Sequence, residues 1–181
     1  MVSRLNFYFG VFLTTTLLIA SPILIALDGG MSEYPLGAGD MISIKVFGEA
    51  DLSHEIRLSD TGTIAYPFLG ELTVSGLTTG RLSELIRSQL ADGYLVNPSV
   101  NVSVVEYRQF YIHGQVKSPG GYPYQPGLSL QKAVALAGGF TERASRSKMY
   151  LVPEGGGPRT GLRLDSKVSP GDIITIEESF F

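Results

Sequence analysis

From residue 31 onward, hydrophobic residues mostly recur at every second position, which is the period of a β-strand with one buried face. The clearest run is 41–46, where isoleucine or valine occupies alternate positions. We expect further extended segments over 54–59, 63–74 and 100–104, with turn residues at 60–62. The first half of the chain is therefore predicted to be mainly β-structure.

The segment 63–74 is predicted to be one extended run with a local irregularity. Ile64, Tyr66 and Phe68 stand at alternate positions, so they are expected on one face. Pro67 has no amide hydrogen to donate to a neighbouring strand. The run should therefore lie at a sheet edge or bend near this proline.

Two segments have the period of an α-helix instead. In 78–93, leucine and isoleucine recur at intervals of three and four, with Thr78 or Thr79 as the N-cap. A second, shorter helix is predicted over 128–137, with Ser129 as its N-cap. Glycine follows each segment and is expected to end the helix.

The second half repeats this organisation. We expect strands over 110–116, 147–152 and 173–176, and a glycine-rich surface loop over 153–161. Strands mixed with single helices indicate an α+β protein. The chain is predicted to contain two small modules over 34–107 and 108–181, each with one helix on a small mixed sheet.

A short sequence repeat is common to the two predicted modules. Gly39–Asp40 and Gly171–Asp172 each stand directly before an alternating strand. Glycine can adopt a positive φ, and an aspartate can accept hydrogen bonds from the amides that follow it. We therefore expect the same strand-opening turn in both places.

The amino terminus is predicted to be a targeting segment over residues 1–27. Arg4 precedes an apolar run of about 23 residues, which is long enough to cross a membrane as a helix. A cleaved signal usually has a shorter apolar region, although Pro22 would favour processing. Both alternatives, signal peptide and uncleaved signal anchor, place the rest of the chain outside the cytoplasm.

Charge and composition exclude several classes of protein. The formal net charge is -3 and there is no cluster of lysine and arginine, so nucleic acid is not expected as a partner. The chain has no cysteine, which excludes a disulfide, a thiolate metal site and a cysteine nucleophile. It also excludes a lipid anchor on cysteine.

No group of residues has the pattern of a catalytic, cofactor or metal site, and we expect a protein that is not an enzyme. Asp60–Thr61–Gly62 matches the Asp-Thr-Gly of aspartic proteases, but it is also an ordinary turn sequence. His54 and His113 are the two histidines, and neither lies in a recognised triad or zinc motif.

The candidate binding residues form an aromatic and polar group around the predicted boundary at 107/108. Tyrosine rings can stack on sugar rings, and arginine and glutamine can bond to sugar hydroxyls. The same residues are suited to contacts between subunits. The members of this group are Tyr107, Arg108, Gln109, Tyr111, Tyr122 and Tyr124.

Several sequence motifs, in order, resemble those of one family of bacterial proteins. Three of them are similar to the polysaccharide export (PES) domain and lie at 36–46, 60–76 and 94–102. Two others resemble a soluble-ligand-binding β-grasp (SLBB) domain, at 112–122 and 137–141. The ending at 170–181 is also typical of the family. The chain is thereby identified as a member of the outer-membrane polysaccharide export family.

This resemblance implies a non-enzymatic, periplasmic component of a capsule or exopolysaccharide export machine. The implied partners are the polysaccharide, an inner-membrane polysaccharide co-polymerase and an outer-membrane channel protein, and the protein is expected to form a homo-oligomeric ring or an adaptor. It would be anchored by its amino-terminal helix or associated with the outer membrane. Compared with family members that form the outer-membrane conduit, this chain lacks the lipidated cysteine, further SLBB domains and a carboxy-terminal amphipathic helix, so we expect a short periplasmic member. The alternative is a free-standing periplasmic carbohydrate-binding module.

Overall fold

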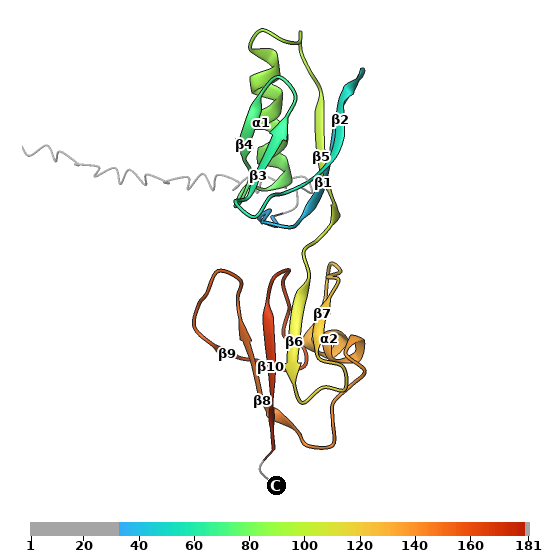
Figure 1. Cartoon of the computed structure of the whole chain (residues 1–181), viewed down its shortest axis with the longest axis vertical. Helices are drawn as coiled ribbons and strands as arrows, with labels where there is room; N and C mark the ends of the chain where they lie inside the picture. Colours follow the sequence, from blue (N-terminus) through green and yellow to red (C-terminus); the bar gives the residue numbers. More distant parts are fainter. Residues whose placement is uncertain (1–32, 180–181) are drawn as a thin grey trace, which may run out of the picture. The chain divides into compact units, whose positions relative to one another are not determined.

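The computed structural model describes residues 33–179, which belong to one compact unit (Figure 1). The predicted targeting segment 1–27 lies outside the described residues. Within 33–179, neither helix is long and apolar enough to cross a membrane. The division into modules at 107/108 stays a prediction, although two separate hydrophobic cores lie on either side of it.

The first sheet has three antiparallel strands in the order β2-β1-β5. They are β1 (Met41–Val46), β2 (Glu49–Arg57) and β5 (Val100–Glu106), and β1 has the predicted bounds. Ile44 of β1 is opposite His54 on one side and Val102 on the other. The expectation of a mixed sheet is wrong here, because a hairpin joins β1 to β2 and β5 also returns antiparallel to β1.

The segment 63–74 is a hairpin and not one extended run, which corrects the prediction. Strand β3 (Thr63–Tyr66) pairs antiparallel with β4 (Gly70–Thr73). Phe68 has a φ of 63° and Gly70 a φ of 74°, and these left-handed conformations reverse the chain. Phe68 is therefore exposed at the turn and does not share a buried face with Ile64 and Tyr66, which are both buried.

Helix α1 (Thr79–Ala91) packs against β5 and closes the first core. Thr78 is its N-cap, since the threonine side chain accepts a hydrogen bond from the amide of Arg81 at 3.3 Å. The apolar residues at helical spacing face inward, and the fully buried ones are Leu82, Ile86 and Leu90. The predicted period and cap are thus confirmed.

The second sheet has five strands in the order β7-β6-β10-β8-β9. It is mixed, because β10 runs parallel to β6 and antiparallel to β8. Strand β8 begins three residues earlier than predicted, and β7 and β9 are short glycine-containing strands that alternation does not reveal. The bounds are β6 (Phe110–Gly114), β7 (Gly120–Tyr122), β8 (Ala144–Val152), β9 (Thr160–Gly161) and β10 (Ile173–Glu178).

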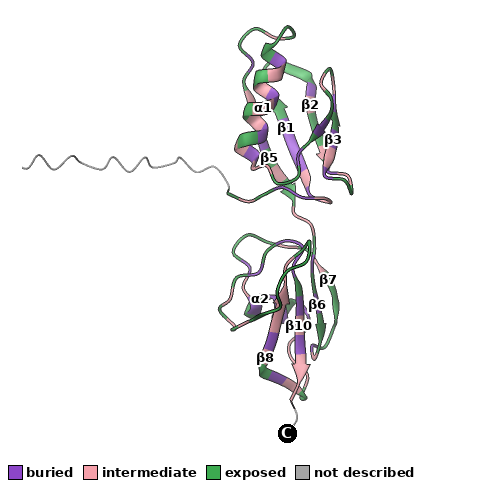
Figure 2. Cartoon of the chain, turned by 90° about the vertical axis from the view of Figure 1, so that its left-hand side faces the viewer, coloured by how far each residue is buried: buried purple, intermediate pink, exposed green. Residues whose placement is uncertain are grey.

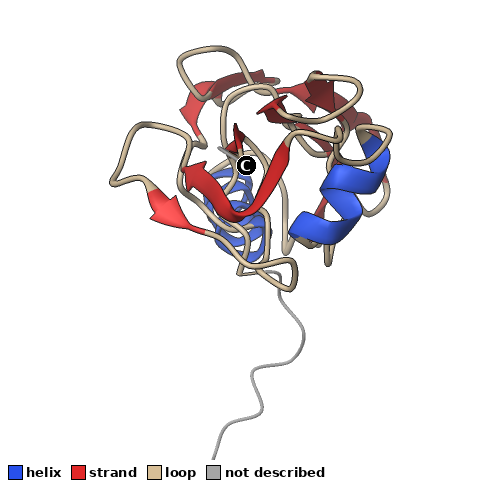
Figure 3. Ribbon diagram, turned by 90° about the horizontal axis from the view of Figure 1, so that it is seen from below, coloured by secondary structure: helices blue, strands red, loops and turns tan. Residues whose placement is uncertain are grey.

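Helix α2 (Leu130–Leu136) contributes Leu130, Ala133 and Val134 to the second core. Its N-cap is Ser129, as predicted, with the side chain accepting from the amide of Lys132. Two helices among many short strands are consistent with the α+β class (Figure 3). The buried core residues that the structure describes lie within 36–176 and residues 31–181 form one compact unit, so this part of the chain is expected to fold without the amino-terminal segment.

Candidate functional site

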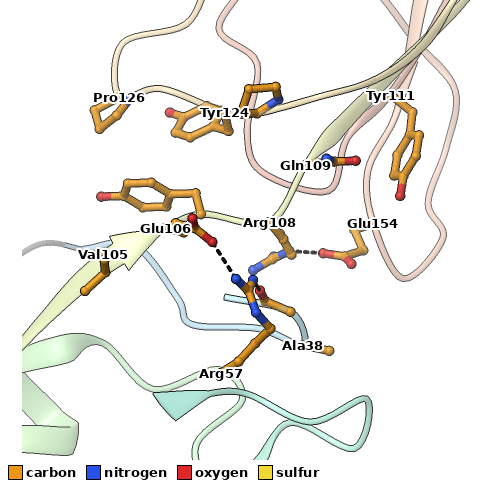
Figure 4. A pocket seen from close by; sticks show the side chains of 13 residues that line it. Ala38, Arg57, Val105, Glu106, Arg108, Gln109, Tyr111, Tyr124, Pro126 and Glu154 are labelled. Carbon is orange, nitrogen blue, oxygen red and sulfur yellow. Dashed lines mark hydrogen bonds and ion pairs between the residues drawn. The ribbon is translucent and has the colours of Figure 1, made fainter. Parts of the chain in front are cut away.

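An open pocket of about 700 Å³ lies where β5 leads into β6 (Figure 4). Five of the six predicted binding residues line it, namely Tyr107, Arg108, Gln109, Tyr111 and Tyr124. The other lining residues are Ala38, Gly39, Arg57, Val105, Glu106, Pro123, Pro126 and Glu154. Residues from both predicted modules therefore meet in one site.

Tyr122, the sixth predicted residue, lies outside this lining. Its ring stacks on that of Phe110, with centroids 6.0 Å apart, and its hydroxyl donates to the carbonyl of Ser118 at 2.6 Å. Tyr122 also packs against the second core. Its position is that of a structural aromatic residue at the edge of a sheet.

An aromatic wall forms one side of the pocket. The rings of Tyr107 and Tyr124 meet edge to face, with centroids 5.3 Å apart, and Tyr34 packs against Tyr107 in the same way at 5.0 Å. Burial, with smaller effects of Tyr124 and Asp40, raises the pKa of Tyr107. The hydroxyl of Tyr107 is therefore protonated at neutral pH and can donate a hydrogen bond to a ligand.

The charged residues of the lining balance one another. Arg57 forms an ion pair with Glu106, and Arg108 forms one with Glu154 (Figure 4). The lining contains no other charged side chain. With two arginines and two glutamates, the pocket has no net charge and does not select for an anionic ligand.

Arg108 connects the two predicted modules through contacts that are mostly part-buried. Its backbone amide donates to one oxygen of the Asp40 carboxylate at 2.8 Å, and its Nη1 donates to the other at 2.9 Å. Nη1 also donates to the hydroxyl of Tyr34, and Nε donates to Glu154. Burial alone would lower the pKa of Arg108, but Tyr34, Asp40 and Glu154 more than offset this, and the pKa is raised.

Asp40 is fully buried and accepts four hydrogen bonds. Besides Arg108, its donors are the hydroxyl of Tyr34 at 2.7 Å and the amide of Gly37 at 2.8 Å. Burial, then the hydrogen bond to Asp40, raises the pKa of Tyr34, so its phenol remains a donor. The engaged Arg108 side chain is a positioning element of the pocket wall and not a free group for sugar.

The short sequence repeat, Gly39–Asp40 and Gly171–Asp172, forms the same kind of turn in both places. Asp172 accepts from the amide of Ser169 at 2.7 Å, just as Asp40 accepts from the amide three residues before it. The expectation that each aspartate would bond to amides after it is therefore wrong in direction. The positive φ of Gly39 and Gly171 is confirmed, at 88° and 84°.

Sequence reasoning missed Tyr34, Asp40, Arg57, Glu106 and Glu154 as residues of this region. The short sequence repeat singled out Asp40, but only as a turn residue. Tyr34, Arg57 and Glu154 have no local pattern because they reach the site from distant parts of the chain, and Glu106, although adjacent to Tyr107, belongs to no motif that marks it.

Asp60, His54 and His113, which the sequence analysis did not assign to a catalytic site, are all exposed, and none of them is hydrogen-bonded to another. Asp60 lies in the turn before β3. The Nε2 atom of His54 is 2.8 Å from the carbonyl oxygen of Asp51, and that of His113 is 3.1 Å from Thr175 Oγ1. Across residues 33–179, no cluster of three or more His, Asp or Glu residues is arranged to hold a metal ion.

Comparison with known proteins identifies two domain families along the chain. Residues 29–105 match the polysaccharide biosynthesis/export protein family, and residues 109–163 match the SLBB domain family. The exopolysaccharide production protein ExoF of Rhizobium meliloti is 35% identical over 130 residues, covering 65% of this chain and 31% of the relative.

Two further relatives show the same similarity at lower identity. The polysialic acid transport protein KpsD of Escherichia coli is 25% identical over 134 residues, covering 73% of this chain and 24% of the relative. The EPS I polysaccharide export outer membrane protein EpsA of Ralstonia nicotianae is 26% identical over 183 residues, covering 81% of this chain and 48% of the relative. The chain thus spans between about a quarter and about a half of the length of these proteins.

Proposed function

The chain belongs to the polysaccharide biosynthesis/export family, and we propose on this basis that it is a non-enzymatic component of a capsule or exopolysaccharide export machine. The observation that carries the proposal is the two family domains in consecutive order, together with relatives named for polysaccharide production, transport and export. The resemblance found in the sequence motifs is thereby confirmed at the level of the family.

In this proposal the protein acts in the periplasm after export directed by segment 1–27, which is either cleaved as a signal peptide or retained as an anchor. It works between an inner-membrane polysaccharide co-polymerase and an outer-membrane channel protein, as a homo-oligomeric ring or adaptor. A periplasmic site is supported by the apolar amino terminus, and self-association by the strands that end each small sheet with an unpaired edge.

The junction pocket, defined by the 13 lining residues given above, is the place where the protein would contact the polymer. Tyr107 and Tyr124 offer ring faces and hydroxyls, and the paired arginines leave no net charge to trap a passing chain. Weak, repeated contacts of this kind suit a polymer that has to move on. The expected ligand is a stretch of neutral pyranose units.

A direct test of the site is binding of defined oligosaccharides to residues 31–181. The chain has no tryptophan, so its intrinsic fluorescence comes from its tyrosines, which include Tyr107 and Tyr124 of this wall. Tyr107→Ala together with Tyr124→Ala should abolish the fluorescence change and the binding, whereas Tyr122→Phe should leave both unchanged. Equal binding by the double variant would remove the pocket from the proposal.

The role in export is tested in the organism that encodes the chain. Deletion of the gene should stop the appearance of polysaccharide outside the cell, and the intact gene should restore it. Normal secretion after deletion would contradict the proposed function.

A free-standing carbohydrate-binding module is the second candidate, because a single copy supplies every lining residue of the pocket. The two candidates differ in oligomeric state, since a conduit requires closed assemblies. Native mass spectrometry with and without the periplasmic domain of the co-polymerase separates them. A strict monomer in both, in cells that secrete normally, would favour the binding module.

A further inference from the structure

Three connections in the first half of the chain carry large apolar side chains that are exposed. In Figure 2 the loop after α1, which is one of them, is mainly green, the colour of exposed residues. Phe47, between β1 and β2, is 89% exposed, and Phe68, between β3 and β4, is 68% exposed. Tyr94 and Val96, in the loop after α1, are 52% and 100% exposed. We call these four residues the apolar tip.

Short contacts join the three connections of the apolar tip. The amide of Phe47 donates to the carbonyl of Ser99 at 2.9 Å, which ties the first turn to the loop after α1. The hydroxyl of Tyr94 donates to the carbonyl of Phe68 at 3.3 Å, and their ring centroids are 5.5 Å apart. These contacts hold the three connections together, and the rings of Phe68 and Tyr94 touch each other.

Phe68 is held outward by an unfavourable backbone conformation. Phe68 has a φ of 63°, and a positive φ is uncommon and strained for a residue other than glycine. An exposed apolar cluster on a small domain also has a cost in water and usually marks an interaction surface. Together these features favour the apolar tip as a docking surface.

The charges around the apolar tip have one sign. The stretches 47–51, 67–71 and 92–99 contain four carboxylates and no lysine or arginine. No ion pair within residues 33–179 involves these carboxylates, which are Glu49, Asp51, Glu71 and Asp92. Two such tips would repel each other, and a negatively charged lipid surface would repel them as well.

The second half of the chain carries the opposite charge. Residues 33–107 contain ten Asp or Glu and four Lys or Arg, a net charge of -6. Residues 108–181 contain nine Lys or Arg and six Asp or Glu, a net charge of +3. Copies of this protein therefore attract one another most strongly when the first half of one faces the second half of the other.

The second half also contains a hollow of about 500 Å³ that complements the apolar tip. Half-buried leucines and the buried Met149 provide an apolar floor. Arg146 lies over the ring of Phe140 and has no ion pair within 33–179, and Arg163 has a 3.4 Å pair with Asp165 that is highly exposed and therefore weak. The lining residues of this basic hollow are Gln131, Arg146, Ser147, Met149, Leu162, Arg163, Leu164 and Asp165.

We propose that the apolar tip of one copy docks into the basic hollow of a second copy. Phe47, Phe68 and Val96 would bury apolar surface, while the carboxylates around them would face Arg146 and Arg163. The contact joins two different surfaces, so each copy keeps one tip and one hollow available, and such contacts can close into a ring. The inference rests on the proposed self-association and names the surfaces that meet.

Disulfide trapping tests this contact directly, because the chain has no cysteine of its own. Val96→Cys places a thiol on the apolar tip, and Ser147→Cys places one in the basic hollow. Residues 31–181 carrying one or the other, with a size tag on one, should form a mixed disulfide dimer only when the two variants are oxidised together. Ser118→Cys, an exposed residue outside the hollow, should give no mixed dimer with Val96→Cys.

The outcomes separate this inference from the proposed function. A dimer formed by Val96→Cys alone, or self-association of the unaltered chain without the mixed disulfide, would overturn the contact and leave the oligomer standing. Absence of any self-association in sedimentation would overturn the contact as well, whereas the role in export is tested separately by secretion after deletion of the gene.

Charge exchange provides a second, independent test. Arg146→Glu with Arg163→Glu should weaken self-association at least tenfold, and Glu49→Lys with Asp92→Lys in the partner copy should restore it. Added salt should weaken the contact between unaltered copies as well. Self-association that is unaffected by the two glutamates would refute the proposed contact.

Discussion

Replacing Arg108 by methionine tests whether the buried contacts at the junction stabilise the fold. Methionine keeps the length and apolar stem of the side chain but removes the guanidinium. Asp40, which is fully buried, would then keep its hydrogen bonds from Tyr34, Gly37 and the backbone amide of residue 108 but lose the one ion-pair partner that it has within residues 33–179. The ionised carboxylate would remain in an environment that penalises it.

The size of the effect follows from these contacts. Removing one partner of a buried ion pair costs about 3–5 kcal/mol, and the three remaining donors place this case near the lower end, at about 3 kcal/mol. Typical domains unfold with about 5–15 kcal/mol, so the loss is a large part of the total.

Urea unfolding of residues 31–181, followed by tyrosine fluorescence at pH 7, measures this loss. Arg57→Met is the matched control: its ion pair with Glu106 is mostly exposed, and its loss should cost less than about 1 kcal/mol. If the free energy of unfolding falls by the same small amount in both variants, the Arg108–Asp40 pair does not stabilise the fold, which would refute this prediction.

Three further predictions concern single positions. Burial raises the pKa of Asp172, so the protonated carboxyl contributes to stability below about pH 4. This contribution is lost as pH rises through the raised pKa of the folded state. Asp172→Asn should remove this part of the pH dependence of the free energy of unfolding, measured in urea titrations. A Cβ on Gly37 would lie 2.4 Å from Arg108 Nη1, so Gly37→Ala should cost about 1–2 kcal/mol in the unaltered chain but almost nothing beside Arg108→Met, with Gly120→Ala nearly neutral in both. Phe68→Gly should relieve the positive φ and raise the free energy of unfolding by up to about 1 kcal/mol, while self-association measured by sedimentation is weakened.

Local features of the sequence were sufficient for most of the secondary structure. The period of two at 41–46, the helical spacing within 78–93 and the caps at Thr78 and Ser129 act over a few residues, and the structure has them as predicted. The family motifs are also contiguous stretches, so the order of residues along the chain is enough to identify the family.

The hairpin at Phe68 could not be predicted from the local sequence. Phenylalanine disfavours a positive φ, so no propensity rule places a reversal at this residue. Contacts with the loop after α1, through the ring and hydroxyl of Tyr94, accompany that conformation. Only the folded chain brings these two segments together.

The junction pocket was half determined by the sequence and half by the tertiary structure. Tyr107, Arg108 and Gln109 are adjacent in the chain, so their polar and aromatic character could be recognised from the sequence. The carboxylates that hold Arg108 are Asp40 and Glu154, which are 68 and 46 residues away from it. The energy of an ion pair depends on distance in space and on burial, and neither is encoded at a fixed spacing in the sequence. The sequence therefore determined which residues were available for the site, and the packing of two cores decided which of them are free to meet a ligand.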